Sequence, residues 1–174
     1  MNQDKARMLA GIGFKLLNED KLVESESKYQ EAINLIDPDH WATTDIHAEF
    51  GMLLNKLGKK NEALEQYNLS LEAALRNDEP SSVTVTLARY FLADYNKHLG
   101  NLEKALNIIR PSIESECESK WLACFVAAQI HFKLGNETAS DELASQVMFL
   151  APKGKYTSLK DLKGLIRSTY DENS

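Results

Sequence analysis

Apolar and small residues recur along most of the chain with the period of a helix that buries one face. Leu9, Ile12, Gly13 and Leu16 fall at positions i, i+3, i+4 and i+7, and residues 106–113 repeat this spacing with one polar interruption. Good helix formers recur almost throughout, and no segment alternates between apolar and polar residues as a half-buried strand does. The chain is therefore predicted to be all-α.

Short polar breaks divide this helical pattern at similar intervals. Each break joins a residue that ends a helix, glycine or aspartate, to a tight turn and the start of a new helix. The breaks lie at residues 18–25, 57–63, 99–105 and 134–140. Asp20, Gly58, Gly100 and Gly135 are equivalent positions, and they lie 38, 42 and 35 residues apart. The sequence thus predicts a repeat built from helix hairpins.

The residues between the breaks follow a common order of large, small and aromatic side chains. In the first two repeats this order falls on Leu9, Ile12, Gly13, Leu16, Ser25, Tyr29 and Ala32, and then on His47, Phe50, Gly51, Leu54, Ala63, Tyr67 and Ser70. In the next two it falls on Arg89, Leu92, Ala93, Asn96, Ala105, Ile109 and Ser112, and then on Cys124, Ala127, Ala128, His131, Ser140, Ala144, Val147 and Pro152. The order resembles that of the tetratricopeptide repeat family. The resemblance implies one domain, a right-handed superhelical solenoid of about four hairpins at residues 6–39, 44–77, 86–119 and 121–154.

Small residues on the first helix of each repeat predict a close approach to the second helix. Glycine or alanine at these positions leaves room for a large side chain opposite. The small residues are Gly13, Gly51, Ala93 and Ala128, and the large ones are Tyr29, Tyr67 and Ile109. One hairpin cannot bury its apolar face alone, so the repeats are expected to stack. Residues 37–44 and 77–82 have turn composition and are predicted to be loops.

The chain beyond the last repeat is predicted to form one more helix, at about residues 158–169. Ser158 to Asp161 has the sequence of a capping box, and apolar residues follow along one face. We interpret it as the helix that caps the solenoid. Residues 153–167 carry a net charge of +4, against −8 for residues 1–152. The basic side chains could bind an acidic partner, but an ordinary solvated helix face is the favoured interpretation.

Composition excludes several classes of protein. The 174 residues include 20 Lys and Arg against 26 Asp and Glu, a formal net charge of −6, which argues against nucleic acid as a partner. The chain is 43% hydrophobic and 26% charged, as globular proteins are, and no apolar run suits a signal sequence or a membrane span. Its only cysteines, Cys117 and Cys124, are too few for a disulfide framework. A cytoplasmic protein without a membrane partner is predicted.

Residues that could carry chemistry are sparse. Cys124 and His131 lie seven residues apart on one helix face, but a structural zinc site needs four ligands, usually in closer pairs. Both occupy packing positions of the repeat, so they are predicted to belong to the core. The segment Gly11-Ile12-Gly13 lacks the third glycine and the preceding strand of a dinucleotide site. The sequence predicts no metal, no cofactor and no catalytic activity.

The resemblance also implies where a partner would bind. Ligands of the family contact the first helix of each repeat at fixed positions. At these positions the candidate partner-binding residues are Arg7, Phe14, Asn18, Asp45, Met52, Asn55, Lys56, Tyr90, Asp94, Lys97, Phe125, Gln129, Phe132 and Lys133. Aromatic rings among adaptable polar side chains suit a segment of another protein. The alternative is that some of these rings pack against the neighbouring repeat.

One known function of the family is not expected here. Family members that bind the carboxylate tail of heat-shock chaperones share a clamp of lysine, asparagine and arginine side chains. At the matching positions this chain has Ala10, Phe14, Glu49, Leu87 and Phe91. The clamp is missing, so a co-chaperone of that kind is not predicted.

The leading prediction is a non-catalytic module that binds a peptide or helix of another protein in a concave groove. Two alternatives stay open. The first is a small acidic inhibitor or immunity-type protein that neutralises a basic toxin or enzyme by charge complementarity. The second is an intracellular chaperone for a secreted protein, because small repeat chaperones are similar in size and architecture. The apolar lining expected of the groove also leaves a homodimer open.

Overall fold

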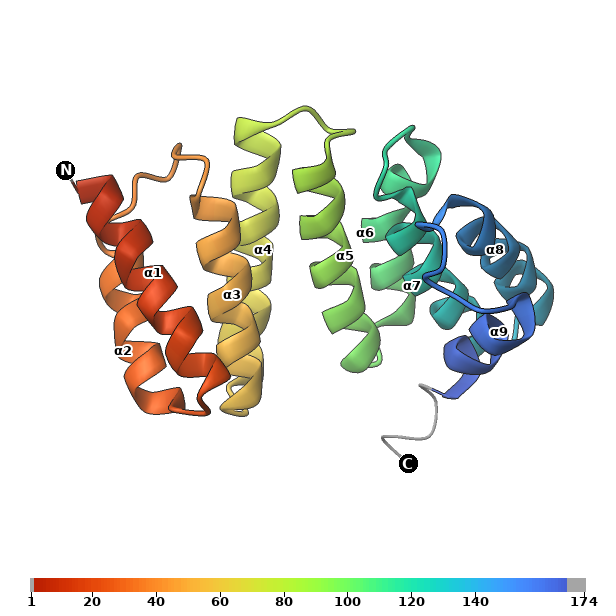
Figure 1. Ribbon diagram of the computed structural model, residues 1–174, viewed down its shortest axis with the longest axis horizontal. Helices are drawn as coiled ribbons and strands as arrows, with labels where there is room; N and C mark the ends of the chain where they lie inside the picture. Colours follow the sequence, from red (N-terminus) through yellow and green to blue (C-terminus); the bar gives the residue numbers. More distant parts are fainter. Residues whose placement is uncertain (1, 169–174) are drawn as a thin grey trace. The chain divides into compact units, whose positions relative to one another are not determined.

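The protein consists of helices joined by short turns. The computed structural model describes residues 2–168, and within them the chain forms nine helices and no strand (Figure 1). The all-α prediction is confirmed. The chain divides into two compact units, unit 1 (Met1–Glu79) and unit 2 (Pro80–Ser174), which are described separately below.

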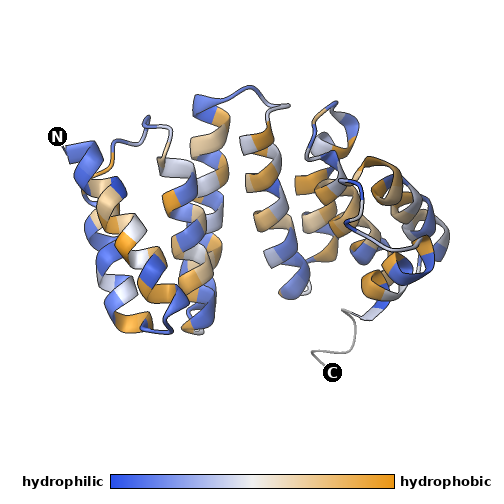
Figure 2. Ribbon diagram, viewed as in Figure 1, coloured by the Kyte–Doolittle hydropathy of each residue, from blue (hydrophilic) through white to orange (hydrophobic). Residues whose placement is uncertain are grey.

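Unit 1 contains two helix hairpins. The first helix of each hairpin packs along the second, and the second hairpin packs mainly against α2. The helices are α1 (Asn2–Asn18), α2 (Leu22–Ile33), α3 (Thr43–Lys56) and α4 (Lys60–Asn77). The loop predicted at residues 37–44 lies between α2 and α3. Figure 2 shows the helices striped with hydrophobic and hydrophilic residues, as expected of helices that bury one face.

Unit 2 contains two further hairpins and a last, shorter helix. Its α7 packs against α5, α6, α8 and α9, so α7 is the central helix of the unit. The helices are α5 (Val83–His98), α6 (Leu102–Glu114), α7 (Lys120–Lys133), α8 (Glu137–Leu150) and α9 (Leu159–Ser168). The second predicted loop, at residues 77–82, precedes α5.

The residues predicted to end helices do so in the structure. Gly58, Gly100 and Gly135 have φ angles of 75°, 81° and 77°, and Asp20 has a φ of 58°. This left-handed conformation is accessible to glycine without strain, and aspartate tolerates it better than most residues do. At the turn between α3 and α4, the left-handed conformation of Gly58 lets the Lys59 N–H donate to the Leu54 carbonyl at 2.9 Å. The predicted positions of these turns are confirmed.

The close approach predicted within each hairpin of unit 1 is present. A Cβ atom on Gly13 would lie 3.0 Å from the Tyr29 ring, and one on Gly51 would lie 3.1 Å from the Tyr67 ring. The Ser25 hydroxyl of α2 also donates to the Gly13 carbonyl at 2.8 Å. Glycine on the first helix therefore makes room for a buried tyrosine on the second.

We expect Gly13→Ala to lower the free energy of unfolding by about 1 kcal/mol, although alanine is the better helix former. The Tyr29 ring cannot give way easily, because it is fully buried, stacks on Phe50 at 5.7 Å and donates a hydrogen bond to Glu49. Gly11→Ala is the matched control. Nothing lies within 4 Å of its new Cβ, so it should gain up to about 1 kcal/mol in urea unfolding. A Gly13→Ala variant at least as stable as the wild type would contradict this account.

The core of unit 2 consists of two neighbouring clusters. One joins α5, α6 and α7 and contains Ala93, Ala105, Ile109, Ala123, Val126, Ala127 and Ile130. The other joins α7, α8 and α9 and contains Cys124, Ala128, Ala144, Val147, Leu162 and Ile166. The last helix thus belongs to the core of the unit rather than to a separate tail.

The start of α9 follows the predicted cap. The Asp161 N–H donates to the Ser158 hydroxyl oxygen at 3.1 Å, and that hydroxyl in turn donates to the Asp161 carboxylate at 2.7 Å. Lys163 and Arg167 form ion pairs with Asp141 of α8 at 2.8 and 3.4 Å. These two basic residues therefore have partners inside unit 2. The predicted end of this helix, residue 169, lies outside the described residues.

The helices offer no membrane span. Among residues 2–168, none of them combines the length and the apolar character that crossing a bilayer requires.

Candidate functional site

In unit 1 the predicted partner-binding residues lie on α1 and α3, and all of them are exposed. The set is Arg7, Phe14, Asn18, Asp45, Met52, Asn55 and Lys56. We call this surface the α1/α3 face. Phe14 and Met52 are 42% and 39% exposed, which is high for large apolar side chains. The α1/α3 face therefore offers two apolar anchors among polar groups.

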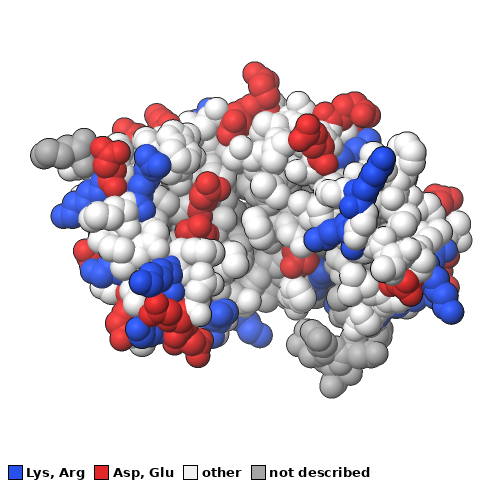
Figure 3. Space-filling model, viewed as in Figure 1, with Lys and Arg blue, Asp and Glu red and all other residues white. Residues whose placement is uncertain are grey.

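Two carboxylates give the α1/α3 face a negative charge. Asp45 and Glu49 lie one turn apart on α3, and the Tyr29 hydroxyl donates to Glu49 at 2.9 Å. Partial desolvation of the carboxyl groups raises the pKa of both, although the Asp45 residue as a whole is exposed; at Glu49 the Tyr29 hydrogen bond opposes the shift and the charge of Asp45 adds to it. Neither forms an ion pair with a side chain of residues 2–168. Figure 3 shows acidic side chains (red) over α3.

Glu49 was not among the predicted binding residues, although its place could have been read from the sequence. Asp45, Glu49 and Met52 fall at i, i+4 and i+7, so they share one side of the helix. The ligand-contact positions carried over from the family include Asp45 and Met52, whereas Glu49 stands only at a position of the missing chaperone clamp.

Arg7 has an aromatic partner that the sequence pattern did not reveal. Its guanidinium lies over the Trp41 ring, 4.7 Å from the ring centroid, and it also faces Asp4 at 3.9 Å. Trp41 lies in the loop before α3 and is 60% exposed. A repeat pattern cannot find such a residue, because the loop lies between repeats.

In unit 2 the predicted residues lie on α5 and α7, and several are connected to one another. The set is Tyr90, Asp94, Lys97, Phe125, Gln129, Phe132 and Lys133. We call this surface the α5/α7 face. The Lys97 ammonium donates to Asp94 at 2.5 Å and to Gln129 of α7 at 2.6 Å. The Lys97 side chain is only 2% exposed. Lys97 and Gln129 therefore join the two helices and leave little surface for a partner.

Asp94 is the acidic centre of this network. Burial on its own would raise the pKa of the Asp94 carboxyl, but hydrogen bonds and charges from His98 and Lys97 outweigh it and hold the pKa low. The His98 Nε2 atom lies 3.4 Å from the second carboxylate oxygen. Burial, with smaller effects from Asp94 and Tyr156, raises the pKa of Tyr90 to about 12. Asp94 is therefore ionised and Tyr90 neutral at pH 7.

The aromatic rings of the α5/α7 face are covered in part by the chain itself. Tyr156, from the segment between α8 and α9, stacks on Phe125 with ring centroids 6.3 Å apart and an interplanar angle of 11°. The Arg167 guanidinium lies 5.5 Å from the centroid of the Phe132 ring. Phe125 and Phe132 therefore pack in part against the chain itself, in a way that neither prediction anticipated. The contacts come from the end of unit 2 rather than from a neighbouring repeat.

The Cys124 thiol lies buried in the core of unit 2. Burial raises the pKa of the Cys124 thiol, the opposite of what a nucleophilic cysteine needs. Among residues 2–168, no three His, Cys, Asp or Glu side chains gather as the ligands of a metal ion would.

One family model matches part of the chain. Residues 44–77, which contain α3 and α4, match the family model described as tetratricopeptide repeat. No curated protein matches the chain in sequence.

Three solved structures are similar in fold. A tetratricopeptide repeat protein from Parabacteroides merdae ATCC 43184 is 18% identical, with a TM-score of 0.71 over 97% of this chain, and this chain spans 62% of that protein. YrrB, described as a TPR protein with an unusual peptide-binding site, is 16% identical, with a TM-score of 0.66 over 94% of this chain and 74% of its own. BtubC from P. vanneervenii is 10% identical, with a TM-score of 0.75 over 88% of this chain and 68% of its own. The predicted resemblance is confirmed at the level of fold.

Proposed function

Since this chain has the tetratricopeptide repeat fold and its residues 44–77 match that family, we propose that it is a non-catalytic protein-interaction module. It binds a peptide or helical segment of another protein on the exposed faces of the first helices of its repeats. YrrB supports this proposal, because a protein of similar fold is described as having a peptide-binding site.

The observation that carries the proposal is the exposure of Phe14 and Met52 on the α1/α3 face. Large apolar side chains supply most of the binding energy in protein interfaces when polar groups surround them. Both anchors lie at positions that ligands contact in the family, and Asp45 and Asn55 lie on the same face. The arrangement offers hydrophobic anchoring together with hydrogen bonds and charge.

The test is to recover partners from the protein's own cells at native levels and identify them by mass spectrometry. The wild type, a Phe14→Ala/Met52→Ala variant and an Ile12→Ala variant are compared. Ile12 is a matched control, because it is 41% exposed, as Phe14 is, but lies two residues away and so on another side of α1. We expect the affinity of the double variant for the partner to be at least about tenfold lower than that of the wild type, because two apolar anchors are lost.

The control should keep the partner. A folded double variant that binds as well as the wild type would exclude the α1/α3 face as the site. If the wild type recovers no protein at native levels, the proposed function itself fails.

A basic partner, as for an inhibitor or immunity-type protein, is the second candidate. Unit 1 has nine Lys and Arg against fifteen Asp and Glu, whereas unit 2 has eleven of each. All of the net charge of −6 therefore belongs to unit 1, which presents Asp45 and Glu49 beside the apolar anchors. Association with a basic partner should slow steeply as salt rises, whereas binding through the apolar anchors should not. Association rates of the recovered partner at low and high salt separate the two candidates.

A further inference from the structure

Two aromatic residues of α7 are covered by the segment that joins α8 to α9, residues 151–158. Besides its stacking on Phe125, the Tyr156 ring meets Trp121 edge to face, with centroids 6.4 Å apart and an interplanar angle of 73°. The Lys155 ammonium lies 5.6 Å from the centroid of the Trp121 ring. We propose that Trp121 and Phe125 form a subsite for an aromatic side chain of a partner protein, and that Tyr156 and Lys155 occupy this subsite until the partner displaces them.

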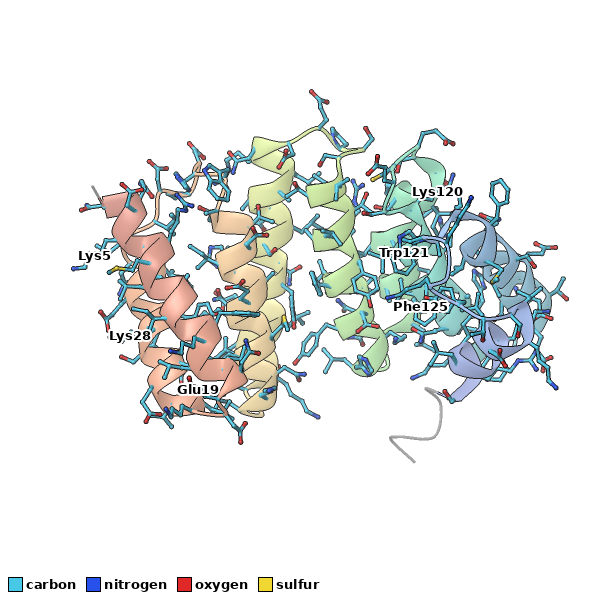
Figure 4. The ribbon with its side chains drawn as sticks, viewed as in Figure 1. Lys5, Glu19, Lys28, Lys120, Trp121 and Phe125 are labelled. Atoms are coloured by element: carbon cyan, nitrogen blue, oxygen red, sulfur yellow. The ribbon has the colours of Figure 1, made fainter. Side chains whose placement is uncertain are left out.

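The geometry of the subsite selects a flat ring. Trp121 and Phe125 lie one turn apart on α7 and on the same side of it (Figure 4). The Phe125 ring lies nearly parallel to the Tyr156 ring, and the Trp121 ring lies nearly perpendicular to it. Stacked and edge-to-face arrangements at these distances are those that aromatic pairs prefer. A phenylalanine, tyrosine or tryptophan of a partner could make the same two contacts.

The joining segment contacts the rest of unit 2 mainly at two of its residues, Ala151 and Tyr156, which pack against the cluster of α7, α8 and α9. Pro152, Lys153, Gly154 and Lys155 are exposed, and Gly154 has a φ of 81° within a turn closed by the Lys155 N–H and the Pro152 carbonyl. Among the described residues, its only aromatic and cation–π contacts with α7 are those of Tyr156 and Lys155.

Both ends of the segment are anchored independently of these contacts. Val147 of α8 and Leu162 of α9 are fully buried in the same cluster, and Lys163 forms an ion pair with Asp141 of α8. Lifting the segment from Trp121 and Phe125 therefore requires Tyr156 to leave the surface of this cluster, whereas both helices keep their own anchors.

Displacement of the segment has a measurable effect on binding. Two aromatic contacts and one cation–π contact favour the covered state by about 10- to 100-fold. The apparent affinity of a partner falls by the same factor, because only the uncovered fraction of the protein can bind. The inference rests on the proposed function, since it assigns to that module an aromatic anchor and a competitor built into the chain.

The experiment uses the fluorescence of Trp121 in the full chain. Trp41→Phe makes Trp121 the only tryptophan, and acrylamide quenching then reports its accessibility. In this background, Lys155→Ser/Tyr156→Ala is expected to increase quenching of Trp121. Lys153→Ser, an exposed lysine in the same segment, is the matched control and should leave quenching unchanged.

Rescue in trans tests whether the subsite accepts a ring from another molecule. A synthetic peptide of residues 151–158 is titrated to millimolar concentration. It should restore the protection of Trp121 in the Lys155→Ser/Tyr156→Ala variant and bind the Lys153→Ser control at least about tenfold more weakly. The same peptide with Tyr156→Ala should restore nothing.

Two results would overturn the inference. The first is a folded Lys155→Ser/Tyr156→Ala variant with unchanged quenching or no rescue. The second is a peptide that binds the control and this variant equally. Neither result involves a partner protein, so failure here leaves the proposed function standing. Failure of partner recovery contradicts the proposed function and leaves the covered state of Trp121 to be judged by its own measurement.

Discussion

Lys97→Met is expected to lower the free energy of unfolding by about 3 kcal/mol at pH 7. The substitution keeps most of the volume of a side chain that is 2% exposed, but it removes the ammonium that bonds to Asp94 and Gln129. Removing one partner of a buried ion pair leaves the other charge without compensation. Asp94 is 30% exposed and recovers some hydration, so the lower part of the usual range for such losses applies.

The loss should depend on pH in a defined direction. The folded pKa of Asp94 is held below its unfolded value, so its ionisation stabilises the fold above the unfolded pKa, near 3.9. That contribution disappears as the pH falls through the folded pKa. Without Lys97 the part of it that Lys97 supplies is already gone, while the His98 hydrogen bond remains, so wild type and variant should differ most at pH 7 and least near pH 3. Urea unfolding at both pH values measures the difference.

A double variant separates the missing charge from the missing packing. Lys97→Met/Asp94→Asn has no unpaired carboxylate and should recover part of the stability that Lys97→Met loses. If Lys97→Met unfolds within 0.5 kcal/mol of the wild type at pH 7, roughly the effect of an ordinary surface change, the network does not join α5 to α7.

The contacts of Lys97 also show which interactions can be predicted from the sequence and which cannot. Its spacing from Asp94 predicts that the two side chains can meet on one helix. Gln129, 32 residues further along, comes from another helix, and only the packing of α5 against α7 brings it to the ammonium. A residue predicted to face a partner is therefore mostly enclosed.

The predictions that held were those governed by local chemistry. The φ angles at Asp20 and Gly58 follow from turns that need a left-handed residue, and the Gly13 contact with Tyr29 follows from the small and large positions of one hairpin. These features depend on a few neighbouring residues, so a repeat pattern contains them.

The covering of Phe125 by Tyr156 could not be predicted in this way. The joining segment begins at the end of the last repeat, and only there does the following helix, α9, start no further repeat. Its position depends on where α8 ends and α9 docks, and both are consequences of tertiary packing. The same holds for Trp41, whose loop brings it to Arg7.

The second large effect is expected at Leu162→Ala, which should cost about 3 kcal/mol of unfolding free energy. Leu162 is fully buried between Cys124 and Ala128 of α7 and Ala144 and Val147 of α8, all within one cluster. Small neighbours cannot extend into the space that the lost leucine leaves, so a cavity remains.

Leu165→Ala, on the same helix, is the matched control. Leu165 is 46% exposed, and its loss should change stability by no more than about 0.5 kcal/mol in urea unfolding. Both variants keep the ion pairs of Lys163 and Arg167, so the comparison isolates burial. A Leu162→Ala variant no less stable than Leu165→Ala would mean that α9 does not share the core of unit 2. The anchor that holds Tyr156 over Phe125 would then be absent as well.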